Sequence, residues 1–338
     1  MLGESENTIR ESSFISPRNI AIFIIFSMVV FALVGVYGDP NEVLLALGSI
    51  PWMWVLPAMM ALSFLNYIIR YFKWQYFLHR IHIRLSHADS FSVFLAGFTL
   101  TTTPAKIGEA VKGYFIRTID GTPVAKTAPL VISERVTDLL AMVILVLVGF
   151  SVGINTGNQL LTVLVLGGAV LGGAIVLGTG VFYSRILKRL TSVGPLKRFQ
   201  DSLDLVEDTM TKTLSPRPML AGTAISIPGW FMECIELWLL LTVLAPAIPM
   251  SPLLLLLTAT FIHSTASVIG AVSFLPGGVG TYELTSVLLI PLLLGVSTSH
   301  ASAATILIRV VTLWFSVIVG FVALGIVTQR ARKRNSDD

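Results

Sequence analysis

Apolar runs of membrane-spanning length recur along the whole chain. A helix needs about 20 predominantly apolar residues to cross the hydrocarbon core of a bilayer. Runs of this kind cover residues 20–38, 51–78, 129–152, 160–182, 219–245 and 301–327. Only 12% of the 338 residues are charged, which is about half the share found in ordinary soluble domains. Because charged side chains normally cover a soluble surface, the pattern predicts an all-α polytopic membrane protein.

Two further segments are apolar but interrupted by proline and glycine. They cover residues 90–117 and 252–296, and the interruptions read Pro104-Ala105-Lys106-Ile107-Gly108-Glu109 and Pro276-Gly277-Gly278-Val279-Gly280-Thr281-Tyr282-Glu283. Proline removes a backbone donor and glycine adds conformational freedom, so each interruption is expected to break a helix. At membrane depth, such a break is tolerated only where protein or a water-filled cavity satisfies the freed backbone groups.

Lysine and arginine are distributed unevenly among the loops. They gather after the second run, ahead of the third, throughout residues 183–218 and at the C-terminus, and we count Arg70 and Lys73 with this basic set. The loops that contain neither residue type are 39–42, 155–158, 245–251 and 297–300. Because cytoplasmic loops carry the excess of basic residues, we expect the basic loops and both termini on the cytoplasmic side of the cell membrane.

This orientation determines the path of the two interrupted segments. Both flanks of 90–117 are then cytoplasmic, and both flanks of 252–296 are external. We therefore predict about six full spans and two oppositely oriented re-entrant helical hairpins, an inverted-repeat arrangement that places a site near the membrane midplane in many transporters. The segment 252–296 is also long enough for two complete spans, which would raise the count to as many as eight without changing the orientation.

A single transmembrane domain is expected to account for most of the chain. It would cover residues 20–327, between a cytoplasmic N-terminal segment (1–19) and a cytoplasmic tail (328–338). Within the cytoplasmic loop at about 183–218, apolar residues recur at helical spacing, namely Leu203, Val206, Met210 and Leu214. This spacing predicts an amphipathic helix that lies on the inner headgroups of the bilayer.

Several ionisable side chains fall inside the apolar segments. Each costs at least about 2.5 kcal/mol near the bilayer centre, so each needs a partner or a function. The basic residues among them are Lys106, Arg135 and Arg309, and the acidic residues are Glu109, Glu134, Asp138, Glu233, Glu236 and Glu283. One interpretation is structural: Arg309 pairs with Glu283 or Glu233, and Arg135 pairs with Glu109.

The other interpretation is a polar cavity that binds a lipid phosphate. Lys106, Arg135 and Arg309 would contact the phosphate, because the planar fork of arginine gives bidentate hydrogen bonds to such groups. The six carboxylates would balance charge or carry protons. The residues Pro104, Gly108, Pro276, Gly277, Gly278 and Gly280 would form the helix breaks that border the cavity.

Other chemistry-bearing residues indicate no cofactor or metal. Three histidines at positions 79, 82 and 87 have no convincing metal-ligand spacing, and the single cysteine, Cys234, allows no disulfide framework. His263, within an apolar run, is expected to form a hydrogen bond between helices. The net charge of +4 comes from loops beside apolar runs, so it indicates orientation signals and no nucleic-acid partner.

Three motifs carry a resemblance to a known family. They are Pro104-Ala-Lys-Ile-Gly-Glu109 with the basic run to Arg117, Glu134-Arg-Val-x-Asp138, and Pro276-Gly-Gly-Val-Gly-x-x-Glu283 followed by Arg309. With these motifs, nearly the whole chain resembles the flippase-like family that includes the transmembrane region of lysylphosphatidylglycerol synthases. Ala105 stands where the family often has glycine, which is a departure in the first of the two breaks.

The resemblance implies a protein that binds lipid head groups and moves them between leaflets, with a phospholipid or a polyprenyl-phosphate-linked lipid as substrate. Full-length synthases carry a soluble aminoacyl-transfer domain after the membrane part, and no segment here has room for one, so lysyl transfer by this polypeptide alone is not expected. Two alternatives remain open: a membrane-embedded transferase acting on lipid phosphates, and a non-transporting partner of a lipid- or glycosyl-transferring enzyme. Membrane lipids are the expected partners, together with a homo-oligomer or a lipid-modifying enzyme.

Overall fold

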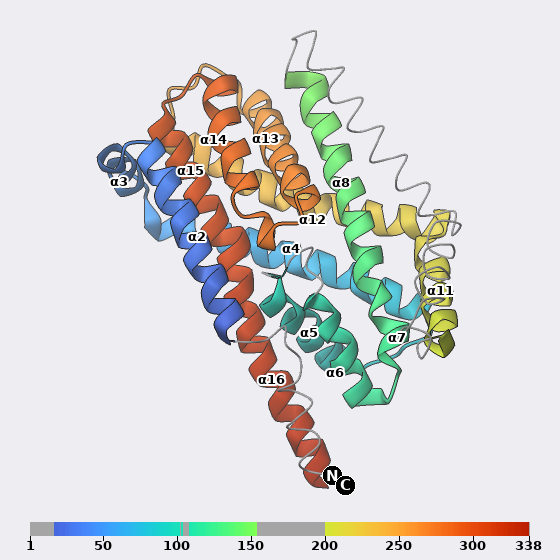
Figure 1. Ribbon diagram of the computed structural model, residues 1–338. Coiled ribbons are helices and arrows are strands. Elements are labelled where there is room, and N and C mark those ends of the chain that lie inside the picture. The colour runs from blue at the N-terminus through green and yellow to red at the C-terminus, as the bar shows by residue number, and fades with distance from the viewer. Residues whose placement is uncertain (1–16, 102, 104–107, 154–199, 338) are drawn as a thin grey trace.

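The computed structural model describes residues 17–101, 103, 108–153 and 200–337. Throughout these ranges the secondary structure is helical, with no strand (Figure 1). The predicted span 160–182 and the residues Pro104 and Lys106 lie outside the described parts of the chain. The prediction of an all-α fold is confirmed.

Among the described residues, five helical segments are long and apolar enough to cross a bilayer. They are α4 (Trp52–Arg80), α12 (Pro216–Leu244), α13 (Pro252–Val272), the segment Pro276–Leu294 and the segment Thr298–Arg330. A sixth candidate is the pair α2 (Pro17–Tyr37) and α3 (Pro40–Gly48), which is bent by 95° at the break between them. The chain is therefore a membrane protein with several transmembrane helices, as the apolar runs predict.

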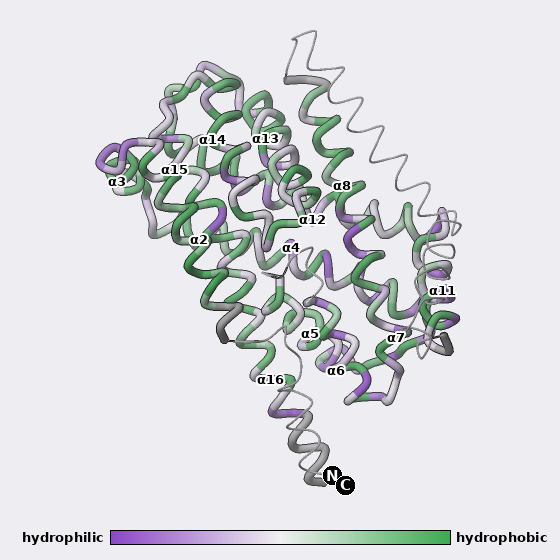
Figure 2. Tube along the Cα trace, in the orientation of Figure 1, coloured by the Kyte–Doolittle hydropathy of each residue, from purple (hydrophilic) through white to green (hydrophobic). Residues whose placement is uncertain are grey.

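Large apolar side chains cover the outer face of α2. Ile22, Ile25, Met28 and Leu33 are each more than half exposed, and Figure 2 shows that most of the α2 trace is hydrophobic. In water such a surface would be a liability, because soluble proteins rarely expose contiguous apolar patches of this kind. In a bilayer the acyl chains solvate it.

The first interrupted segment folds into short helices. It contains α5 (His87–Ala96), η2 (Gly97–Leu100) and α6 (Val111–Asp120). The two α-helices have 10 residues each, so each is about 15 Å long and reaches about halfway across a 30 Å hydrocarbon core. α5 and α6 also pack against each other, which agrees with a hairpin that enters and leaves on one side.

The second interrupted segment is longer. α13 has 21 residues and α14 (Thr281–Leu294) has 14, with the short η5 (Pro276–Gly278) between them. These lengths correspond to about 31 Å and about 21 Å. α13 and α14 pack side by side (Figure 1), so the hairpin is present, while the choice between a re-entrant hairpin and two full spans stays a prediction.

Two helix pairs form the centre of the bundle: α4 with α12, and α13 with α8 (Pro129–Gly153). The α8–α13 crossing is close because Gly149 has no side chain there. A Cβ atom at this position would lie 2.6 Å from the backbone nitrogen of Phe261, a separation that real Cβ atoms do not adopt. Small residues at crossings of this kind let transmembrane helices approach closely.

The last membrane segment contains a change of helix type. α15 (Thr298–Arg309) continues into a π-helical turn, η6 (Val310–Trp314), and then into α16 (Phe315–Asp337). Single π-helical turns inside α-helices are rare and are frequent at functional sites. Arg309 is the last α-helical residue before this turn, which gives the predicted arginine an unusual backbone setting.

The amphipathic stretch that the sequence predicts forms α11 (Gln200–Leu214). Its buried residues Met210 and Leu214 pack against Val136 and Leu140 of α8, and α7 (Val124–Thr127) also contacts it. The predicted helix is therefore present. Its apolar face contacts protein at these residues, and its position on the inner headgroups stays a prediction.

Candidate functional site

A polar stripe runs along α4 on the side that faces α12 and α8. Ser63, Asn66, Arg70 and Lys73 follow one another at spacings of three, four and three, which places them on one helix face. All four are buried, and Lys73 is fully inaccessible. The assignment of Arg70 and Lys73 to a basic cytoplasmic loop is therefore wrong: α4 continues to Arg80 and carries both cations inside the bundle.

Asp138 of α8 is the centre of the first charge cluster. Its carboxylate forms an ion pair with Lys73 and lies 3.6 Å from Nη2 of Arg70 and 3.2 Å from Nη2 of Arg135. Ser226 of α12 donates a hydrogen bond to the same carboxylate at 3.0 Å. One buried acid thus joins α4, α8 and α12, and three cations neutralise it.

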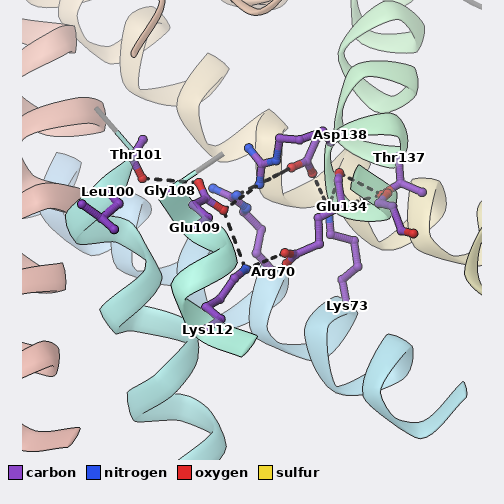
Figure 3. Close-up of polar contacts among 12 residues, drawn as sticks. Arg70, Lys73, Leu100, Thr101, Gly108, Glu109, Lys112, Glu134, Thr137 and Asp138 are labelled. Atoms are coloured by element: carbon purple, nitrogen blue, oxygen red, sulfur yellow. Dashed lines mark hydrogen bonds and ion pairs between the residues drawn. The ribbon is translucent and has the colours of Figure 1, made fainter. Parts of the chain in front are cut away.

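Lys112 of α6 connects two further acids to this cluster (Figure 3). Its Nζ lies 2.5 Å from Oε2 of Glu134 and 3.7 Å from Oε2 of Glu109. Arg135 Nη2 lies 3.5 Å from the same oxygen of Glu109, so the predicted Arg135–Glu109 pair is confirmed. Together with Asp138, the described part of the cluster holds three anions and four cations, Arg70, Lys73, Lys112 and Arg135.

Arg309 forms the second cluster, at the break between α13 and α14. Its Nε donates to Oε1 of Glu283 at 2.7 Å, and its Nη2 donates to the carbonyl of Gly277 at 2.7 Å. The other oxygen of Glu283 accepts a hydrogen bond from the backbone N–H of Gly280 at 2.6 Å. The predicted Arg309–Glu283 pair is therefore confirmed, and it holds the break in place.

The break itself needs its glycines. Gly277, Gly278 and Gly280 have φ values of +60°, +66° and +95°, a region that side chains disfavour. At Gly278 a Cβ would also lie 3.0 Å from the Cα of Gly270 on α13. The Pro276-Gly-Gly-Val-Gly280 motif thus encodes a tight turn that brings the start of α14 against α13.

A third polar group lies on α12. Asn66 Nδ2 donates to Oε1 of Glu233 at 2.6 Å, and Ser63 Oγ donates to Oε1 of Glu236 at 2.8 Å. His263 of α13 lies with Nε2 3.2 Å from Oε2 of Glu233, although the two are not aligned for a hydrogen bond. Its Nδ1 is 2.9 Å from the Tyr282 hydroxyl of α14, which confirms the predicted hydrogen bond between helices.

The three groups surround one cavity of about 300 Å³. Its charged lining residues are Arg70, Glu109, Arg135, Asp138, Glu233 and Arg309, and Gly277 and Gly278 also contact it. Glu109 follows the first helix break and Gly277 lies in the second, so both interrupted segments reach the same cavity. Glu283 contacts the lining through Arg309, whereas Glu134 pairs with Lys112 and Glu236 accepts from Ser63. These three acids and the helix-break residues Gly108, Pro276 and Gly280 are not among the lining residues of the cavity.

The rest of the cavity lining is mostly apolar and aromatic. Phe98 and Trp230 lie beside the guanidinium of Arg70, at 5.5 and 5.7 Å from ring centre to Cζ. At the C-terminal end of α13 the lining includes Val272 and Phe274, which are 52% and 66% exposed. The cavity therefore extends from a buried charged end to an apolar outer surface.

The prediction missed Arg70 and Lys112 as members of the site. Arg70 was assigned to a loop because the positive-inside rule was applied to every arginine near the end of an apolar run. Its spacing from Asn66 and Lys73 on one helix face was the signal that could have identified it. Lys112 is three residues after Glu109, which is the spacing of a pair on one helix face.

This fold and cavity define a polytopic membrane protein with a buried arginine-lined pocket between two broken helical segments. Residues 20–320 match the family model of the lysylphosphatidylglycerol synthase transmembrane region. The chain belongs to this family, as the resemblance of the motifs indicates.

Curated relatives agree with this assignment. A UPF0104 membrane protein of Methanothermobacter thermautotrophicus is 24% identical over 326 residues, which cover 90% of this chain and 94% of the relative. The UPF0104 membrane protein MJ1078 of Methanocaldococcus jannaschii is 24% identical, over 71% of this chain and 99% of its own length. The glycosyltransferase AglD of Haloferax volcanii is 23% identical over 84% of this chain, but only 50% of AglD is covered.

Proposed function

We propose that the cavity binds the phosphate of an anionic lipid head group and that the protein moves this lipid between leaflets. The main support for this proposal is that Arg70, Arg135 and Arg309 line the same cavity inside an apolar bundle. Membership of the lysylphosphatidylglycerol synthase transmembrane-region family supports a role connected with lipids. The substrate class is a phospholipid or a polyprenyl-phosphate-linked lipid.

Each of these arginines has donor capacity to spare. The Nε groups of Arg70 and Arg135 are buried and have no hydrogen-bond partner among the described residues. Arg309 uses Nε and Nη2 for Glu283 and Gly277, and among the described residues no hydrogen bond engages its Nη1. A buried donor without a partner costs about 1–3 kcal/mol, and a phosphate with several acceptor oxygens would remove that cost at more than one arginine.

The apolar part of the cavity suits the rest of a lipid. A head group at Arg135 and Arg309 would leave the acyl or prenyl chains to pass Phe274 and Val272 toward the bilayer. A water-soluble phosphate compound would gain nothing from these exposed apolar residues. The arrangement therefore favours a lipid over a soluble anion.

A reconstituted assay tests this function against the two alternatives. Purified protein is placed in liposomes that contain fluorescent phosphatidylglycerol, phosphatidic acid or a polyprenyl phosphate in the outer leaflet, with phosphatidylcholine as the neutral lipid. Movement of an anionic lipid to the inner leaflet supports transport. Chemical change of the head group supports a membrane-embedded transferase, and neither result supports a non-transporting partner.

A second candidate, a partner of a glycosyl-transferring enzyme, follows from one comparison. The relative named glycosyltransferase AglD contains a region similar to 84% of this chain within half of its own length. Copurification of such an enzyme with the tagged full chain, together with no lipid movement by the chain alone, would favour this candidate over transport.

We also infer the orientation of the chain and its location in the cell membrane. After removal of Arg70 and Lys73 from the basic set, the exposed arginines Arg80, Arg84, Arg117, Arg217 and Arg330 remain. They lie in or beside α4, α6, α12 and α16. Cytoplasmic placement of these ends, with α3 and the 295–297 turn outside, follows from the positive-inside rule. Labelling of single cysteines introduced at Asn41 and Arg117 with a membrane-impermeant reagent tests it, because only the Asn41 variant should react in intact cells.

A further inference from the structure

The two acids of α12 have a different environment from the arginine cluster. Glu233 and Glu236 are 8% and 0% exposed, and their spacing places them on one helix face. Glu236 has one oxygen bound by Ser63, and its Oε2 has no partner among the described residues. Glu233 is bound by Asn66 and lies beside His263. Among the described residues, the hydrogen-bond donors of these two carboxyl groups are Ser63 and Asn66, and both are neutral.

The arginines on the surrounding helices form their ion pairs with other acids. Arg70 of α4 pairs with Asp138 of α8, and Arg309 of α15 pairs with Glu283 of α14. The other titratable groups of this region, among the described residues, are Tyr67 of α4, Cys234 of α12, His263 of α13 and Tyr282 of α14. Within the described parts of the chain, the basic group that lies beside these two buried carboxyl groups is the imidazole of His263. A buried carboxylate without a charged partner takes up a proton, because its ionised form is poorly solvated.

We propose that this group binds a proton on Glu236, adjoining Glu233 and His263, and that the proton accompanies the anionic head group through the membrane. The second half of this proposal rests on the proposed transport function. The first half, the proton site itself, depends only on the buried contacts of α4, α12 and α13.

A series of contacts runs to the head-group cavity from Glu233, which lies three residues before Glu236 on the same helix face. Glu233, His263 and Tyr282 all line the cavity. The Tyr282 hydroxyl contacts His263 at 2.9 Å, and the guanidinium of Arg309 lies over the Tyr282 ring at 4.7 Å from its centre. A phosphate bound at Arg309 adds negative charge near the acids, and a nearby like charge favours the protonated form of a carboxyl group. Lipid binding should therefore bring a proton with it.

Infrared spectroscopy of the purified full chain in lipid tests the proton site without a transport substrate. The wild type should show the carbonyl band of a protonated, buried carboxylic acid at neutral pH, with the shift expected on transfer to D₂O. Glu236→Gln should lose this band, and Asp204→Asn, which changes an exposed acid of α11, should keep it. A band of equal intensity in all three proteins, or no such band in the wild type, would overturn the proposal.

Lipid movement under an imposed pH gradient tests the coupling. In liposomes with fluorescent phosphatidylglycerol, the wild type should move lipid faster toward the alkaline side and slower when the gradient is reversed. Glu236→Gln should lose this difference between the two gradients. Wild-type movement at the same rate under both gradients would overturn the coupling but not the transport function. No movement under any gradient would count against the proposed function. In that case the infrared result would still decide whether the proton site exists.

Discussion

Arg309 Nε donates to Oε1 of Glu283 across 2.7 Å, and this pair joins the end of α15 to the first turn of α14. Glu283 also caps α14 through the N–H of Gly280. Arg309 therefore has two roles. It neutralises a fully buried acid, and its hydrogen bond to the carbonyl of Gly277 fixes the turn that borders the cavity.

Removal of Arg309 should affect both stability and lipid movement. Arg309→Gln leaves Glu283 buried without its cation, and loss of one partner of a buried pair costs about 3–5 kcal/mol. Thermal unfolding in detergent measures this cost. The control is Lys212→Gln, which removes an exposed pair with Asp208, worth about 1 kcal/mol or less. Equal stability of the two variants would contradict the assigned role of the pair.

Asp138 should be the least replaceable acid of the first cluster. Asp138→Asn leaves Lys73, Arg70 and Arg135 without the carboxylate they share, so we expect a loss of about 3–5 kcal/mol. The double variant Asp138→Asn/Lys73→Met removes one stranded cation and should regain part of that stability. Chemical unfolding compares the single and double variants, and a double variant less stable than Asp138→Asn alone would refute the charge balance described for this cluster.

The sequence predicted two of the ion pairs, but it did not predict all the other residues that surround the cavity. Arg309–Glu283 and Arg135–Glu109 followed from charges placed in apolar runs. Arg70 could not be assigned in the same way, because a cation near the end of an apolar run satisfies the rule for a loop equally well. Its burial depends on where α4 ends and on the position of Asp138 from another helix, which are properties of tertiary packing.

The two helix breaks were likewise predicted in part from the sequence. Proline and glycine predicted that both segments would be interrupted, and the short α5 and α6 agree with a hairpin. Whether the arms of 252–296 cross the bilayer depends on helix tilt and on the position of the lipid boundary, which local sequence does not encode. The first break, with Pro104 and Lys106, lies outside the described residues.

The crossing of α8 and α13 should be sensitive to a single methyl group. Gly149→Ala would place a Cβ 2.6 Å from the backbone of Phe261, so the helices must separate, and overpacking of this kind typically costs about 1–3 kcal/mol. Gly325→Ala in α16, where no atom lies within 4 Å, should be neutral or slightly stabilising, since alanine favours helix. Thermal unfolding of the two variants should therefore give shifts of opposite sign or of very different size.

The turn at Gly278 should be needed for lipid movement. Gly278→Ala combines a φ of +66° with a Cβ only 3.0 Å from Gly270, and we expect slower movement of lipid with little protein lost during purification. Gly295→Asn is the matched control, because Gly295 has a φ of +65° but open space around it, and asparagine tolerates this backbone region. Similar transport rates for both variants would show that the geometry of the turn is unimportant.

The most direct test of the central claim compares three proteins in liposomes with fluorescent phosphatidylglycerol or a fluorescent polyprenyl phosphate. They are the wild type, the double variant Arg135→Gln/Arg309→Gln and the control Arg217→Gln, whose arginine is exposed at the start of α12. If the cavity binds the lipid phosphate, the double variant loses movement of an anionic lipid that the wild type and the control retain, at equal amounts of folded protein. Undiminished movement by the double variant, or no movement of either lipid by the wild type, would contradict the account.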